Sequence, residues 1–319
     1  IRAANGVVLV TTKKGRKDGV QVSLDAYNSF QSKPKLYSVL NAQQFATLAN
    51  TIAADPKQSV AIPTFAAWAD PAALHNVDWQ NEVYRSGLTQ NYSLAVRGGS
   101  EKVQASTSIG YYDQKGIVLG SYYKRVTFGN NTDYQPVKWL KSSSSVKYTW
   151  QDSQNPYGGQ LQNGGSLILL GELPPTLDGG NTLTSQVKDA AGNYGFYNPK
   201  FTEISSYSNP LYSIEHNRSY GSTNFLLLNT SLEATIIDGL KVKSNIGINT
   251  SNFSGSYYSP EDDRASVQYP GSQITNAFYS QHINQTFNWL WENTLSYDKT
   301  FGKHTISFVG GASEQKTFW

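Results

Sequence analysis

Apolar residues recur at every second position in about nine stretches of this chain, from residue 20 to its end. The first stretch carries Val20, Val22, Leu24 and Ala26, separated by polar residues. The apolar positions of the later stretches are Tyr92, Leu94, Val96; Val103, Ala105, Thr107, Ile109, Tyr111; Tyr122, Val126, Phe128; Val146, Tyr148, Trp150; Leu226, Leu228, Leu232, Ala234; Leu240, Val242, Ile246, Ile248; Phe287, Trp289, Trp291, Leu295, Tyr297; and Ile306, Phe308, Ala312. A period of two predicts β-strands with one apolar and one polar face.

The connections between these stretches alternate between short and long. Short ones are predicted at 98–102, around Gln135-Pro136, at Asp238-Gly239 and at 300–302, and long ones over 31–88, 113–121, 152–218 and 254–277. Asp-Gly and other Gly-containing turns supply the positive φ angles of tight hairpins. Outer-membrane barrels have short periplasmic turns and long extracellular loops. The alternation therefore predicts an all-β fold, a transmembrane antiparallel β-barrel with helical insertions in its extracellular loops.

Helical patterns occur inside the long connections. Asn41 is a predicted N-cap for a helix over 41–50, with apolar residues at 45, 48, 49 and 52. Asp78 caps a shorter predicted helix over 78–84, and a third helix is predicted over 165–172. A connection as long as 152–218 is usually functional.

Composition agrees with strands that border a membrane. Aromatic residues make up 13% of the chain although only 38% is hydrophobic, and the mean hydropathy is −0.46. No run reaches the roughly 18 consecutive apolar residues of a membrane-spanning helix, so a spanning form would be a barrel. A net charge of +3 without a large Lys/Arg cluster argues against nucleic acid as a partner.

Catalytic signatures are missing from the sequence. The four histidines are far apart, there is no HExxH or GxSxG motif, and there is no Cys. We therefore expect no enzyme activity and no cofactor. Glu261, Asp262 and Asp263 are weak candidates for a hard cation such as Ca²⁺, but they lack the spacing of a calcium loop, so a solvated loop is favoured.

The run from Arg2 to Gly15 closely resembles the last plug strand of the SusC-like (SusC/RagA) TonB-dependent outer-membrane transporters. In this resemblance Asn5, Gly6, Val7 and Val8 begin the plug strand. Further similar motifs follow in family order: Thr89-Gln90-Asn91-Tyr92-Ser93-Leu94 before 98–102, Gly110-Tyr111-Tyr112-Asp113-Gln114-Lys115-Gly116-Ile117, Asn209-Pro210-Leu211, and residues 295–304.

This resemblance implies a domain organisation and a function. Residues 1–18 would be the C-terminal end of the plug domain, and 19–319 the N-terminal strands of a plugged barrel of about 22 strands, the chain being incomplete at both ends. The implied function is import of oligosaccharide or peptide nutrients. The implied partners are a SusD-like surface lipoprotein that caps the barrel, TonB through the missing N-terminal region, and outer-membrane lipid.

Two loop stretches are candidate contacts for cargo or for the capping lipoprotein: Asn155, Tyr157 and Gln160, and Asn193, Tyr194 and Tyr197. Aromatic faces stack on sugar rings, and amides hydrogen-bond hydroxyls or peptide backbone. Loop packing or contact with the lipoprotein is favoured over direct contact with cargo.

Two alternative functions stay open at this point. The chain could belong to a family member that serves as a structural subunit of a larger outer-membrane complex. It could also belong to a secreted β-rich carbohydrate-binding protein, which would lack the alternation of short and long loops.

The period also fixes expectations about faces and edges. Leu226, Leu228 and Leu232 should face lipid, and Asn229 and Ser231 the lumen. The long connections should be extracellular. The first and ninth strands should not pair with each other, since nine strands would not close a barrel of this kind.

Overall fold

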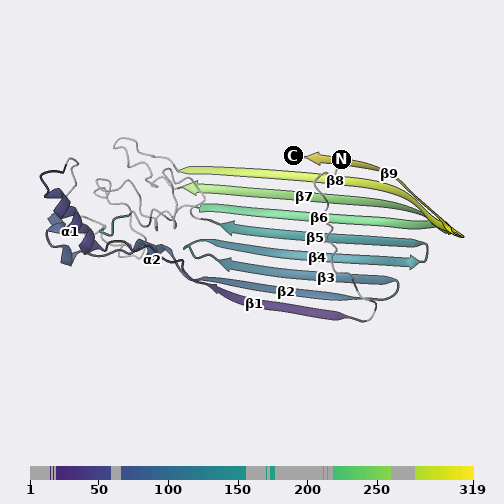
Figure 1. The fold of residues 1–319 in the computed structure, drawn as a ribbon, viewed down its shortest axis with the longest axis horizontal. Coiled ribbons are helices and arrows are strands. Elements are labelled where there is room, and N and C mark those ends of the chain that lie inside the picture. Colours follow the sequence, from purple (N-terminus) through teal and green to yellow (C-terminus); the bar gives the residue numbers. More distant parts are fainter. Residues whose placement is uncertain are drawn as a thin grey trace.

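The described chain forms one antiparallel sheet of nine strands in sequential order (Figure 1). This computed structural model describes residues 15, 17, 19–58, 66–155, 170, 173–176, 211, 214, 218–259 and 277–319. The strands are β1 (Gln21–Gln31), β2 (Gly87–Gly99), β3 (Val103–Lys115), β4 (Tyr122–Val137), β5 (Leu140–Gln154), β6 (Arg218–Ile237), β7 (Leu240–Ser259), β8 (Phe278–Phe301) and β9 (His304–Phe318). The predicted all-β fold and the number of strands are confirmed.

Short and long connections lie at opposite ends of the sheet (Figure 1). Gly239 and Gly302 have φ angles of 88° and 60°, the left-handed conformation that tight turns require. The short connection predicted around Gln135-Pro136 is present but lies about two residues later, between Val137 and Leu140. Pro136 cannot donate a hydrogen bond to the strand ladder, and it lies in the irregularity between Tyr134 and Val137 where the register shifts.

Two predicted helices are confirmed with their caps. Helix α1 (Ala42–Ala53) begins with a capping box, in which Asn41 Oδ1 accepts from Gln44 N at 2.8 Å and Gln44 Oε1 accepts from Asn41 N at 3.1 Å. Helix α2 (Trp79–Val83) begins at Asp78, whose Oδ1 accepts from Asn81 N at 3.0 Å.

Two short 3₁₀ helices, η1 (Ala66–Ala69) and η2 (Pro71–Ala73), were not predicted. The predicted helix over 165–172 lies outside the described residues except for Leu170.

Buried apolar side chains gather in the long connections, beyond the end of the sheet. One cluster joins Val77, Trp79 and Val83 to Leu170, Leu173, Leu211 and Ile214, and a second joins Ala46 and Ala49 of α1 to Trp68. Among the described residues, every buried hydrophobic side chain lies outside the nine strands. Within the part of the chain that the structure describes, the sheet therefore has no buried apolar core on either face, and the packed unit is the cap formed by the connections.

The two outer strands of the sheet do not meet. Strand β1 pairs only with β2, and β9 only with β8, among the residues that the structure describes. The expectation that the nine strands do not close on themselves is confirmed. No helix in the described ranges has the length and apolarity needed to cross a membrane.

Candidate functional site

The strand register gathers the predicted apolar positions on one face of the sheet. Leu24, Leu94, Ile109, Phe128, Tyr148 and Leu226 are direct neighbours across six consecutive strands, and Thr250, Phe287 and Phe318 continue the row. Alternation within each strand puts the other predicted apolar positions on this same face. The result is one apolar surface that runs across all nine strands.

The opposite face is polar. One row on it passes through Gln104, Asp133, Ser143, Ser231, Asn245 and Glu292 on six consecutive strands. Neighbours within this face hydrogen-bond each other: Ser143 Oγ donates to Asp133 Oδ1 at 2.6 Å, and Asn245 Nδ2 donates to Glu292 Oε2 at 3.4 Å. Such cross-strand pairs stabilise the nine-stranded sheet, which we call the wall, while leaving many polar groups available to water.

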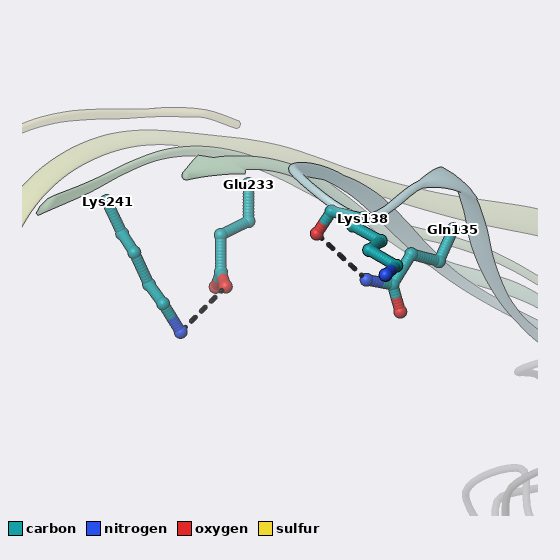
Figure 2. Close-up of polar contacts among 4 residues, drawn as sticks. All are labelled: Gln135, Lys138, Glu233 and Lys241. Carbon is teal, nitrogen blue, oxygen red and sulfur yellow. Dashed lines mark hydrogen bonds and ion pairs between the residues drawn. The ribbon is translucent and has the colours of Figure 1, made fainter. Parts of the chain in front are cut away.

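Curvature of the sheet shows which face is the inner one. Figure 2 shows the ion pair between Lys241 Nζ and Glu233 Oε1 at 3.5 Å, with both side chains on the concave side of the arched strands. Glu233 follows Ser231 by two residues, so the polar row lies on this concave face. Asn229 and Ser231 thus lie on the concave face, and Leu226, Leu228 and Leu232 lie on the opposite face, as the alternation predicts. That the leucines meet lipid and the polar residues the lumen stays a prediction.

A polar pocket of about 150 Å³ lies on the concave wall near the short-turn end. Its lining includes Gly15, Gln104, Asn131, Asp133, Ser143, Ser145 and Asn229. A Cβ on Gly15 would collide with backbone atoms of Gly98, Gln104 and Ala105. Only glycine fits there, so the chain ahead of β1 touches the inner wall at this point.

The cap joins two connections that are distant in the sequence. Trp79 is 3% exposed, and its Nε1 donates to Pro174 O at 2.9 Å. The backbone N–H of Val77 donates to Pro175 O at 3.0 Å. The β1–β2 and β5–β6 connections are thus held together by apolar burial and by two hydrogen bonds.

Arg85 fastens this cap to the β3–β4 connection. Its Nε donates to Gly116 O at 3.0 Å, and its Nη2 donates to Ser121 O at 3.1 Å. The N–H of Arg85 also donates to Ile117 O at 2.8 Å. Burial raises the pKa of the phenol of the neighbouring Tyr84, and the nearby Tyr37 adds a smaller increase. The cap is therefore a bonded structure that sits at the long-loop end of the wall.

Most of the predicted contact residues lie outside the described ranges. This applies to Tyr157, Gln160, Asn193, Tyr194 and Tyr197, to the acidic residues 261–263, and to Asn5, Gly6, Val7 and Val8. Asn155 is described: it is exposed just after β5, and its N–H donates to Ser219 O at 3.1 Å. The described residues include no group of three or more His, Cys, Asp or Glu that is placed to hold a metal ion.

Sequence reasoning missed the residues that organise the cap and the pocket. Trp79 lies inside the predicted helix over 78–84 and Arg85 directly follows it, but no motif marks either residue for a tertiary contact. The sequence feature that could have pointed to the cap is Pro174-Pro175, whose carbonyl oxygens accept hydrogen bonds from Trp79 Nε1 and Val77 N.

Curated relatives of the chain are TonB-dependent receptors. The chain is 29% identical to TonB-dependent receptor P3 of Formosa agariphila, over 99% of this chain and 29% of that protein. It is 30% identical to receptor P26 of the same organism, over 99% and 30%, and 25% identical to TonB-dependent receptor SusC of Bacteroides thetaiotaomicron, over 98% and 30%. The chain spans less than a third of the length of these relatives. No protein-family model matches it.

Solved structures of the RagAB peptide transporter share the fold. One superposes with a TM-score of 0.70 at 17% identity, over 98% of this chain and 36% of that chain. A structure of the RagAB peptide importer in the "open-open" state gives 0.69 at 18% identity, over 98% and 37%. At this identity the likeness supports the architecture of the wall and its cap.

Proposed function

We propose that the complete protein is a SusC-like TonB-dependent receptor of the outer membrane and that it imports nutrients. The proposal is supported by the similarity of nearly the whole chain to TonB-dependent receptors, SusC among them. The relatives are receptors and transporters, not enzymes, so no catalytic step belongs to the function.

One observation carries this proposal: a single sheet has an apolar face and a polar concave face across all nine strands. In a membrane barrel the apolar face contacts lipid and the polar face lines a hydrated lumen. A soluble β-sandwich would cover its apolar face with a second sheet, and the described residues contain only one sheet. The secreted carbohydrate-binding alternative is therefore disfavoured.

The proposal extends to partners and to domain organisation. A SusD-like lipoprotein would sit over the cap, TonB would act on a plug domain, and oligosaccharides or peptides would be the cargo. The contact of Gly15 with the inner wall supports the assignment of residues 1–18 to the end of the plug. Residues 19–319 are then the first strands of the barrel.

Uptake by living cells tests the proposal. The gene for the complete protein is deleted in its native bacterium, and uptake of labelled oligosaccharides and peptides is compared with that of the parent strain and of a strain without TonB. We expect both mutant strains to lose uptake of the same nutrient class. Unchanged uptake of every nutrient by the deletion strain, together with loss of other proteins from an outer-membrane complex, would instead support the structural-subunit alternative.

A further inference from the structure

One row on the concave wall combines aromatic rings, amides and a cation. Tyr27, Asn91, Tyr112, Arg125 and Gln151 are direct neighbours on β1 to β5. Arg125 is the fourth residue of β4, close to the β3–β4 connection that Arg85 holds. The row therefore crosses the wall near its long-loop end, just beneath the cap.

Aromatic contacts orient the Arg125 side chain. Its guanidinium carbon lies 5.4 Å from the centre of the Tyr112 ring, a cation–π geometry. Tyr123 meets Tyr112 edge to face, with 5.9 Å between ring centres and 66° between ring planes. Tyr112 Oη also donates to Gln114 Oε1 at 3.0 Å, and Gln114 Nε2 donates to Gln31 Oε1 at 3.3 Å. The ring beneath the guanidinium is thus fixed from two sides.

Arg125 is exposed and has no ion pair with another described residue. Asp113 and Asp152 are the acidic residues on the adjacent strands nearest to it in register, and alternation puts both on the apolar face. On that face they flank Lys124, the preceding residue. Among the described residues, the concave side of this region therefore presents an oriented guanidinium group without a neighbouring carboxylate.

We propose that Arg125, with Tyr112, Tyr123 and Gln114, is a cargo site on the lumen wall that binds a carboxylate group of the cargo. The planar guanidinium donates two parallel hydrogen bonds to a carboxylate, and stacking on Tyr112 holds it ready. The Gln114 and Gln151 amides offer donors and acceptors to the hydroxyl or peptide groups beside that carboxylate. This inference rests on the proposed import function and narrows its substrate class.

The test uses the purified full-length receptor and two probes that carry carboxylates, a trigalacturonate and a tetraglutamate peptide. Their uncharged counterparts are a neutral galactose trimer and a tetraglutamine peptide. The variant is Arg125→Gln. The matched control is Lys124→Gln, which removes an adjacent cation that also lies over a ring, 5.5 Å from the Tyr122 centroid, but on the apolar face. Titration calorimetry measures each affinity at low and at high salt.

We expect wild type to bind at least one carboxylate probe more tightly than its neutral counterpart, and the probe that does so identifies the source of the carboxylate. Arg125→Gln should weaken that probe about tenfold or more, as expected for a lost charge-assisted hydrogen bond. Arg125→Gln should bind the neutral probes as tightly as wild type does. Lys124→Gln should bind every probe with the wild-type affinity.

Three results would overturn the site: equal affinity for charged and neutral probes, no effect of Arg125→Gln, or equal weakening of both probe types. Nutrient uptake that depends on the complete protein, found together with any of these, would leave the import proposal standing.

Discussion

Replacing Leu228 by arginine is the sharpest test of which face of the wall meets lipid. Leu228 lies in the middle of β6, and its direct neighbours on the apolar face are Val146 and Ile248. Neither neighbour offers a hydrogen-bond acceptor to a guanidinium group. The adjacent Asn229 lies between Ser145 and Gly247 on the concave face, where water and polar groups are available.

The structure sets the size of the effect. The apolar positions of β6 run from Leu226 to Ala234, which is about 26 Å along a strand at about 3.3 Å per residue. A tilt of about 45° turns this into about 20 Å of depth, close to the apolar band of about 25 Å on such barrels. Leu228 lies about 5 Å in depth from the centre of that band. We therefore expect Leu228→Arg to lower the free energy of unfolding by about 2–3 kcal/mol, and Asn229→Arg by less than about 1 kcal/mol.

The assay is reversible urea unfolding of the full-length protein in lipid vesicles, followed by tryptophan fluorescence. Both variants add the same side chain to neighbouring positions, so each is the control for the other. Equal destabilisation at the two positions would refute the assignment of the faces, and so would a larger effect at Asn229.

The remaining predictions concern topology, the cap and the segment before β1. Single cysteines placed at Leu48 and Ser100 should react with a membrane-impermeant maleimide on intact cells only at Leu48, and labelling confined to Ser100 would reverse the orientation. Trp79→Phe should destabilise the cap by about 1 kcal/mol through loss of the bond to Pro174 O, and Trp79→Ala by about 3–5 kcal/mol, measured by limited proteolysis. Equal proteolysis rates of these variants and wild type would contradict that packing. Gly15→Ala should expose the segment before β1 to protease because its Cβ would meet backbone, and unchanged protection would show that the contact is loose.

Alternation of side chains was enough to predict the wall. Every predicted apolar position in the nine stretches falls on one face. In a strand that separates lipid from water, a shift of the pattern by one residue would move every apolar side chain to the wrong face. The caps of α1 and α2 were also predictable, since Asn41 and Asp78 act on amides only three residues away.

The cap and the wall sites were not predictable from local pattern. The Trp79 bond spans 95 residues to Pro174, and Arg85 acts on carbonyls about 30 residues away. The Arg125 site needs three strands brought together in register. The residues next to each of these side chains in the sequence give no sign of its partner, because the contact forms only when distant segments fold together.

Spin-label accessibility along β6 tests the central claim most directly. Nitroxides are attached one at a time at positions 226–233 of the full-length protein in lipid vesicles, and collision with oxygen is compared with collision with a water-soluble nickel complex. We predict a strict period of two, in which even positions favour oxygen and odd positions favour nickel. Absence of the alternation, or nickel access at the even positions, would contradict a wall with a lipid-facing apolar side and a hydrated concave side.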